Sequence, residues 1–291
     1  MTSKITIGVA GSGTMGTGIA IVAARAGFPT IIYDVDQARA ESATAQMKAF
    51  FAKSVQRGKL TQDQVEEIMS RVKATGDIKA MAPCGLVIEA IFEELEIKGK
   101  LFSALDAVCG PDTLFASNTS TLSITEIAAR SGRDDRFVGM HFCLPAQLMK
   151  LVEMSPGLNT SPESFTRAWQ LCEDMGQRPV KTQDAPGFIL NYFLVPFNND
   201  AIRLVEEGVA EPAEIDKAIK GALGYAMGPM ELLDLIGLDT QVLLCEALYG
   251  VTHELRATCP PLLRRMVAAR RLGRKSKRGF LSYDTTTIFG A

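Results

Sequence analysis

A glycine-rich turn at residues 11–16, Gly-Ser-Gly-Thr-Met-Gly, lies between an apolar run at residues 5–9 and an alanine-rich segment. The apolar run predicts a buried strand, and the alanine-rich segment predicts a helix. Gly11 permits the tight turn, Gly13 lets the backbone approach a pyrophosphate, and Gly16 lets the helix pack close to the strand. This order of strand, turn and helix predicts a dinucleotide-binding fold.

The residues that follow the turn indicate which dinucleotide is bound. The helix begins at Thr14 and Met15, whose backbone N–H groups are expected to face the phosphates. A second strand at residues 30–34 ends at Asp34, 18 residues beyond Gly16, where a carboxylate accepts hydrogen bonds from the adenosine ribose. Asp34 should repel a 2′-phosphate, and no arginine follows at once, so we expect NAD rather than NADP. The alternative is a glycine turn that serves packing alone.

Composition limits the class of protein and its partners. The chain has 291 residues, of which 47% are hydrophobic and 22% are charged, so it can form one large or two ordinary domains and is not expected to be disordered. Its net charge of −2 predicts no nucleic-acid partner. No apolar run reaches the roughly 18 residues of a membrane span, and a strand that begins at residue 4 or 5 leaves no room for a signal peptide. We expect a cytoplasmic protein.

Six cysteines are scattered without Cys-x-x-Cys pairs and without clustering around either histidine. This pattern is typical of thiols in a reducing cytosol and predicts neither disulfides nor a metal site. Cys143, two residues after His141, is a conceivable nucleophile, but its apolar neighbours favour a place in the core.

The first part of the chain alternates strand-like and helical patterns, which predicts a parallel, doubly wound sheet of Rossmann type. Expected strands are residues 5–9, 30–34, 86–89, 114–117, 137–141, 148–154 and 180–182. A helical hairpin at residues 38–57 and 61–73, with its turn at Gly58-Lys59, is inserted after the second strand.

From residue 186 onward the pattern is helical, at residues 188–207, 212–223, 228–236, 240–249 and 261–271. We therefore expect an NAD-binding domain over residues 1–185 and an all-helical domain over residues 186–291. Residues 188–197 are too continuously apolar for a helix that faces water all round. We expect them to be buried in a homodimer, with burial inside one monomer as the alternative.

His141 is the first candidate for proton transfer, since it stands at the carboxyl end of an expected strand, the edge where such sheets bind ligands. Glu153, twelve residues on in an apolar run, is the candidate partner for its other ring nitrogen, because a carboxylate is costly to bury alone. A strand, a short loop and a returning strand would bring the two together. The alternative is a core histidine with a structural hydrogen bond. His253 lies in a polar stretch and is expected to be exposed.

A polar cluster at residues 117–121, Ser-Asn-Thr-Ser-Thr, follows another expected strand and falls on the same edge of the sheet. Ser123 and Glu126 form a candidate capping box for the next helix. Both roles are compatible, because Ser123 can cap the helix while Asn118 and Ser120 face the ligand.

Together these stretches resemble the L-3-hydroxyacyl-CoA dehydrogenase family nearly end to end, most closely its compact 3-hydroxybutyryl-CoA dehydrogenase branch. The matching stretches are residues 11–16, 87–90, 116–126, 139–142, 149–153, 186–188, 227–229, 236–239 and 272–276. The resemblance implies that NAD oxidises the 3-hydroxyl of a short acyl-CoA, or the reverse, within fatty acid metabolism. His141 would act as base or acid and Glu153 would orient it.

The resemblance also implies roles for residues that the patterns alone leave open. Ser120 would bind the reacting oxygen, and Asn191 would help to place the substrate carbonyl. Asn118 would lie at the nicotinamide. The other implied contacts are Glu93 and Lys98 with the cofactor and Lys53 and Arg57 with the CoA phosphates.

The loop after His141 departs from the family pattern Phe-Asn-Pro-x-Pro. Here it reads Cys-Leu-Pro-Ala-Gln at residues 143–147, so Leu144 replaces a polar amide and Gln147 replaces a proline. We expect Leu144 to be buried beside the active site and the acyl preference to diverge, for example toward a branched or functionalised chain.

Two other functions use the same features. The first is an NAD-dependent dehydrogenase of a free hydroxy acid or a carnitine-like alcohol, which Lys53 and Arg57 disfavour because such a substrate carries no distant phosphates. The second is a non-catalytic NAD-binding protein, which the intact set of Ser120, His141, Glu153 and Asn191 disfavours.

Overall fold

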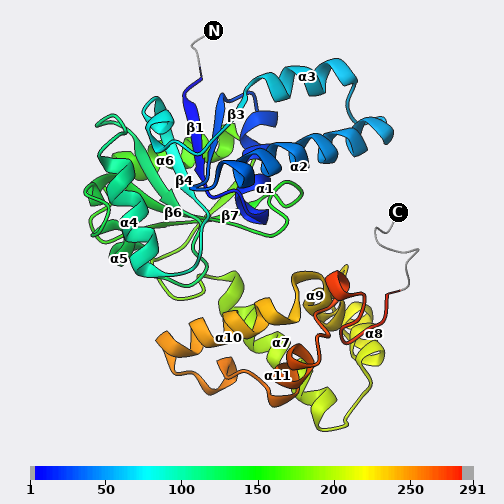
Figure 1. Cartoon of the computed structure of the whole chain (residues 1–291). Helices are drawn as coiled ribbons and strands as arrows, with labels where there is room; N and C mark the ends of the chain where they lie inside the picture. The colour runs from blue at the N-terminus through cyan, green and yellow to red at the C-terminus, as the bar shows by residue number, and fades with distance from the viewer. Residues whose placement is uncertain (1–3, 284–291) are drawn as a thin grey trace. The chain divides into compact units, whose positions relative to one another are not determined.

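The computed structural model describes residues 4–283, and the chain divides into two compact units, Met1–Ala185 and Pro186–Ala291 (Figure 1). A mixed sheet with its covering helices forms unit 1, and helices form unit 2. Within residues 4–283, no helix is both long enough and apolar enough to cross a membrane.

The sheet of unit 1 has the strand order β3-β2-β1-β4-β5-β6-β7-β8. Its strands are β1 (Thr6–Ala10), β2 (Thr30–Tyr33), β3 (Val72–Thr75), β4 (Cys84–Glu89), β5 (Leu114–Ser117), β6 (Phe137–Phe142), β7 (Leu151–Pro156) and β8 (Arg178–Lys181). The chain winds from β1 outward to β3 and then returns to place β4 on the other side of β1. The order therefore reverses between β1 and β4, which is where sheets of this kind bind a dinucleotide.

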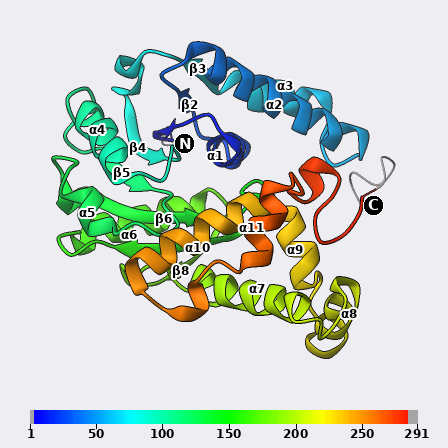
Figure 2. The ribbon, with the colours of Figure 1, turned by 60° about the horizontal axis from the view of Figure 1, so that its bottom comes forward.

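The helices of unit 1 are α1 (Thr14–Arg25), α2 (Gln37–Gln56), α3 (Gln62–Ser70), α4 (Leu95–Asp106), α5 (Ile124–Ala128) and α6 (Pro162–Asp174). They bury the central strands on both faces, so β1 and β2 are almost continuously apolar. The pair α2 and α3 packs together and extends beyond the sheet (Figures 1 and 2).

The prediction of a doubly wound Rossmann-type sheet with an inserted helical hairpin is confirmed, with three local differences. The sheet is not parallel throughout, because β7 runs antiparallel to β6. The second hairpin helix ends at Ser70 rather than residue 73, since the next residues, with β-branched Val72 and Thr75, pair with β2 as the edge strand β3. Helix α6, which follows an N-capping Ser161, was not predicted.

The last residues of unit 1 are tied to the start of α5. The Asp184 carboxylate accepts hydrogen bonds from the backbone N–H groups of Ile124 and Thr125, at 2.7 and 2.8 Å. It also accepts bonds from the hydroxyls of Ser123 and Thr125, at 2.9 and 2.6 Å. Ser123 in turn caps the helix, as predicted, by accepting a bond from the N–H of Glu126. The chain therefore leaves unit 1 from an anchored point.

Unit 2 contains α7 (Leu190–Glu206), α8 (Pro212–Leu223), α9 (Pro229–Ile236), α10 (Leu238–Thr252) and α11 (Pro261–Ala268). Each corresponds to a predicted helix, with ends that differ by at most three residues. Their core includes Val195, Ile202, Leu233, Leu248 and Leu263. His253 is exposed, as predicted, and ends α10 in the left-handed conformation.

Candidate active site

The glycine-rich turn between β1 and α1 has the geometry that a dinucleotide requires. Gly11 has a φ of +111°, a backbone conformation that side chains disfavour. A Cβ on Gly16 would lie 1.9 Å from the Gly11 carbonyl oxygen, so only glycine fits where α1 meets the turn. A Cβ on Gly13, by contrast, would meet no atom within 4 Å. The residues present therefore fit a pyrophosphate against the exposed start of α1 at Gly13 and Thr14.

Asp34 follows β2 directly and is held by the glycine turn itself. Its Oδ2 accepts hydrogen bonds from the backbone N–H of Ser12 at 3.1 Å and from the Ser12 hydroxyl at 2.5 Å. Asp34 is only 7% exposed, and the Arg39 Nε lies 3.8 Å from its Oδ2. Sequence reasoning missed Ser12 and Arg39, whose link to Asp34 depends on how the turn and α2 fold back over β2.

His141 and Glu153 form a buried pair across two strands. They lie directly opposite each other in the antiparallel register of β6 and β7, which puts both side chains on one face of the sheet. The Nδ1 of His141 lies 2.8 Å from Oε2 of Glu153, and the two residues are 7% and 2% exposed. The strand, loop and returning strand predicted for this pair are therefore present, and any proton exchange between His141 and a substrate has to use Nε2.

Asn118 and Ser120 lie in the loop that follows β5, next to the strand that carries His141. The Asn118 side-chain oxygen accepts a hydrogen bond from the backbone N–H of Phe142 at 2.8 Å. The Asn118 N–H donates to the Glu89 carbonyl oxygen at 2.9 Å, which ties the loop to the end of β4. The structure thus brings Asn118 beside the strand residue that follows His141.

Glu93 and Lys98, which the resemblance assigns to the cofactor, lie in a buried ionic cluster with Glu89. The Lys98 ammonium lies 2.5 Å from Oε1 of Glu89 and 3.2 Å from Oε2 of Glu93. Lys98 is 1% exposed, whereas the Glu93 side chain is 35% exposed. Lys98 therefore contacts protein carboxylates, and Glu93 is the member of the cluster that a ligand can reach. Sequence reasoning missed Glu89 because it reads as the end of an apolar strand.

The pKa values of the two carboxyl groups in this cluster shift in opposite directions. Burial raises the pKa of Glu89, and the attraction of Lys98 with the hydrogen bonds from Ser117 and Ile91 only partly offsets it. Burial would also raise the pKa of Glu93, but the attraction of Lys98 and the hydrogen bonds from Thr119 and Ser120 outweigh burial and lower the pKa overall.

The remaining predicted site residues lie on helices. Lys53 and Arg57 are exposed at the end of α2, on the hairpin where they were expected. Asn191 lies in the first turn of α7 in unit 2, where its backbone N–H donates to the Gly187 carbonyl oxygen at 3.0 Å. Their contacts with substrate stay predictions.

The loop after His141 corrects one prediction and confirms another. Leu144 is 41% exposed rather than buried, and it lies in the loop beyond the end of β6. Cys143 is buried, as the core interpretation predicts, and burial raises the pKa of its thiol to about 11. A thiol with that pKa is not a nucleophile near neutral pH. Among residues 4–283, no group of three or more His, Cys, Asp or Glu side chains is placed to hold a metal ion.

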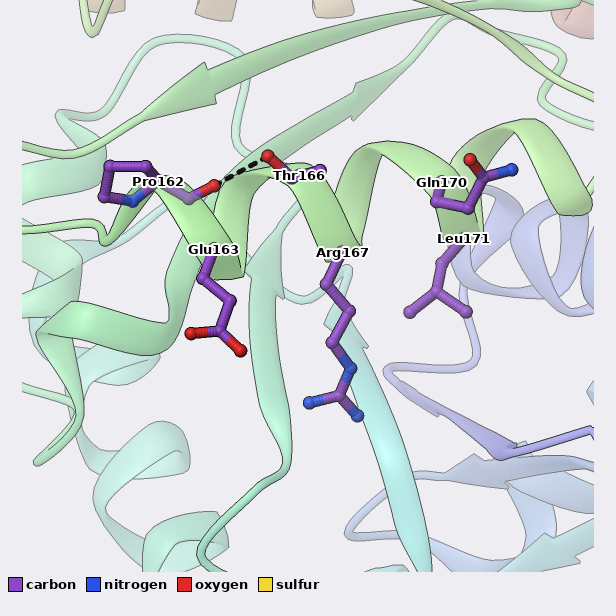
Figure 3. Close-up of a pocket in the computed structure, with 6 residues that line it drawn as sticks. All are labelled: Pro162, Glu163, Thr166, Arg167, Gln170 and Leu171. Carbon is purple, nitrogen blue, oxygen red and sulfur yellow. Dashed lines mark hydrogen bonds between the residues drawn. The ribbon is translucent and has the colours of Figure 1, made fainter.

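A hollow of about 620 Å³ lies on α6 and is lined by Pro162, Glu163, Thr166, Arg167, Gln170 and Leu171 (Figure 3). Glu163, Arg167 and Leu171 point to one side of the helix in Figure 3, as expected at spacings of four residues. Arg167 donates to the carbonyl oxygens of Asp112 and Gly85, which lie at the amino ends of β5 and β4. The hollow therefore lies at the edge formed by the amino ends of these strands. The glycine turn and His141 lie at the opposite edge, where the parallel strands have their carboxyl ends.

Comparison with known proteins identifies the family. Residues 6–185 match the family model described as the NAD-binding domain of 3-hydroxyacyl-CoA dehydrogenase, and residues 187–283 match the model of its C-terminal domain. The chain belongs to the 3-hydroxyacyl-CoA dehydrogenase family. The family resemblance, the NAD-dependent dehydrogenase class and the NAD cofactor predicted from the sequence are confirmed at this level.

Relatives and solved structures of this family cover almost the whole chain. A Bacillus subtilis protein named "Probable 3-hydroxybutyryl-CoA dehydrogenase" is 43% identical over 279 residues, which are 96% of this chain and 97% of the relative. The structure of Mycobacterium tuberculosis FadB2 has a TM-score of 0.93 and 36% identity, and the match covers 96% of this chain and 98% of that one. The structure of (S)-3-hydroxybutyryl-CoA dehydrogenase PaaH1 from Ralstonia eutropha has a TM-score of 0.90 and 36% identity, and the match covers 97% and 100%.

Proposed function

We propose that this member of the 3-hydroxyacyl-CoA dehydrogenase family interconverts a (3S)-3-hydroxyacyl-CoA and the 3-oxoacyl-CoA, with a short acyl chain such as 3-hydroxybutanoyl. The observation that carries the proposal is the His141–Glu153 pair, at 2.8 Å, on the sheet edge that also holds the glycine turn. Several relatives at 36–43% identity are named 3-hydroxybutyryl-CoA dehydrogenases, which supports the choice of a short chain.

In this reaction His141 moves the proton of the substrate hydroxyl. The glycine turn and Asp34 would hold NAD, which would supply the acceptor for the hydride that leaves C3. Nε2 of His141 accepts the hydroxyl proton in the oxidation and returns it in the reduction. Glu153 holds Nδ1 and stabilises the protonated ring, which forms in the oxidation and gives up its proton in the reduction.

The other site residues orient the substrate. The Ser120 hydroxyl would donate to the reacting oxygen, and Asn191 would help to place the substrate carbonyl. Asn118, tied to the backbone of Phe142, would border the nicotinamide. Lys53 and Arg57 are exposed cations on α2 and would meet the CoA phosphates.

The cofactor-binding part of the proposal assigns the pyrophosphate to the glycine turn and the adenosine ribose to Asp34. Gly13, Thr14 and Met15 would face the phosphates, and Glu93 would contact the cofactor from the loop after β4. Lys98 would act on the cofactor only through Glu93, because its ammonium is buried against two carboxylates.

The test is oxidation of NADH at 340 nm with acetoacetyl-CoA and, in parallel, with free acetoacetate, for wild type and His141→Ala. We expect turnover of the thioester alone and its loss in the variant. Turnover of free acetoacetate would instead support a dehydrogenase of free hydroxy acids. Binding of NADH without turnover of either substrate would support the non-catalytic alternative.

We further propose a cytoplasmic homodimer that buries the start of α7. Tyr192 and Phe193 are 55% and 66% exposed there, an unusual exposure for two adjacent aromatic side chains. The mass in solution by light scattering should be twice that of the chain, and Phe193→Asp should lower it. A monomeric wild type would refute the dimer.

A further inference from the structure

The ionic cluster of Glu89, Lys98 and Glu93 connects the end of β4 to α4. Glu89 ends β4, Lys98 lies in the first turn of α4, and Glu93 lies in the loop between them. The two carboxyl groups share one ammonium. Glu89 and Lys98 are 0% and 1% exposed, so their charged forms are costly to bury and have to be compensated by close partners.

Those partners include the loop that carries Asn118 and Ser120. Oε1 of Glu93 accepts hydrogen bonds from the backbone N–H groups of Ser120 and Thr121, at 2.7 and 3.1 Å. The same oxygen accepts bonds from the hydroxyls of Thr119 and Thr121, at 2.6 and 3.2 Å. Four donors from three consecutive residues thus converge on one carboxylate oxygen.

The second carboxylate holds the start of the same loop. Oε2 of Glu89 accepts a hydrogen bond from the Ser117 hydroxyl at 2.6 Å. The Ser117 oxygen accepts one from the backbone N–H of Thr119 at 3.2 Å. Lys98 lies between the carboxylates that hold the two ends of the loop and keeps both in place. We refer to Glu89, Lys98 and Glu93 as the ionic bridge.

We propose that the ionic bridge positions the loop of residues 117–121, and through it the side chains of Asn118 and Ser120, for the reaction at His141. The bridge does not touch the substrate; Glu89 and Lys98 are positioning residues. Asn118 completes the link, because its side-chain oxygen is bonded to the N–H of Phe142, the neighbour of His141 in β6. This inference rests on the proposed dehydrogenase function.

The first test is Lys98→Met, which removes the ammonium and leaves two facing carboxylates. Lys100→Met is the matched control, since Lys100 is an exposed lysine on the same helix. Misplacement of reacting groups by about 1 Å costs up to about 10²-fold in rate. We therefore expect kcat with acetoacetyl-CoA to fall by about 10- to 100-fold in Lys98→Met, with KM changed by less than about threefold. Lys100→Met should match wild type.

Two further variants separate positioning from folding. Glu89→Gln/Lys98→Met replaces both members of the buried Glu89–Lys98 pair by neutral side chains. It should recover much of the melting temperature lost in Lys98→Met, but kcat should stay low because Glu93 still lacks the ammonium. Ser117→Ala removes the hydroxyl that joins Glu89 to the N–H of Thr119 but leaves Glu89, Lys98 and Glu93 in place, and it should lower kcat when assayed well below its melting temperature. A folded double variant or Ser117→Ala with the kcat of Lys100→Met would overturn the proposal.

The same measurements distinguish failure of the proposed dehydrogenase function from failure of the positioning role of the ionic bridge. An inactive wild type that still binds NADH, measured by the change in NADH fluorescence, would refute the proposed function. An active wild type with unaffected bridge variants would refute the positioning role alone.

Discussion

Replacement of Glu153 by glutamine is the change that most directly tests the proposed chemistry. Glutamine has nearly the same shape and still offers an oxygen to the Nδ1 of His141, so the 2.8 Å contact and the pairing of β6 with β7 should persist. The variant lacks only the negative charge. The effect of Glu153→Gln on the rate therefore measures how much that charge stabilises the protonated ring.

The expected magnitude follows from the geometry. Nδ1 and Oε2 are 2.8 Å apart. The centres of the two charges are then about 4 Å apart, and their attraction is about 4 kcal/mol at an effective dielectric constant of about 20. The neutral hydrogen bond that glutamine keeps contributes about 1 kcal/mol. The net loss of about 3 kcal/mol corresponds to a fall in kcat of about 10²-fold.

The assay is steady-state oxidation of NADH with acetoacetyl-CoA, with Glu163→Gln on the exposed face of α6 as the matched control. KM and the dissociation constant of NADH should change little, because Glu153 is buried, contacts His141 from the neighbouring strand and contacts neither ligand in the proposed reaction. A kcat within threefold of wild type would show that the charge has no part in proton transfer.

Three other predictions concern the cofactor, the acyl chain and alkaline pH. Asp34→Ala should raise KM for NADH by about tenfold, since a hydrogen bond to a charged group contributes about 1.5–3 kcal/mol. The variant should also use NADPH better, because the Nε of Arg39 lies 3.8 Å from the Asp34 carboxylate. An unchanged preference for NADH over NADPH would contradict this prediction. Leu144→Asn should shift the ranking of kcat/KM among 3-oxoacyl-CoA substrates of different chain length and branching, and an identical ranking would exclude a specificity role. Burial raises the pKa of Cys172 from 9.0 to about 12, so the unfolded chain loses this proton first and stability falls as pH rises above 9. Cys172→Ala should remove about 2 kcal/mol of the alkaline loss between pH 7 and 10.5, measured by urea unfolding, and an identical pH dependence would contradict this assignment.

Features that depend on local sequence were predictable. The glycine turn, the acid at the end of the second strand and the five helices after residue 186 follow from patterns of neighbouring residues. The His141–Glu153 pair was also predictable, because a histidine at a strand end and a carboxylate in an apolar run both indicate a buried partner.

Features that depend on distant residues were not predictable. Edge strand β3 is short and partly exposed, so the helical pattern before it obscured it. The link of Glu89 to Ser117 joins residues 28 positions apart, and neither residue is unusual in its own segment. The exposure of Leu144 depends on which elements cover the loop after β6, which no local pattern reports.

The pairing of β6 with β7 has a consequence for how this protein can diverge. Strand register places His141 opposite Glu153, on either side of the connection at residues 143–150. Insertions, deletions or substitutions in that connection leave the pair in place as long as the register holds. Evolution can therefore vary the surface beside the reacting atoms without loss of the chemistry, and Leu144 and Gln147 are two such variations.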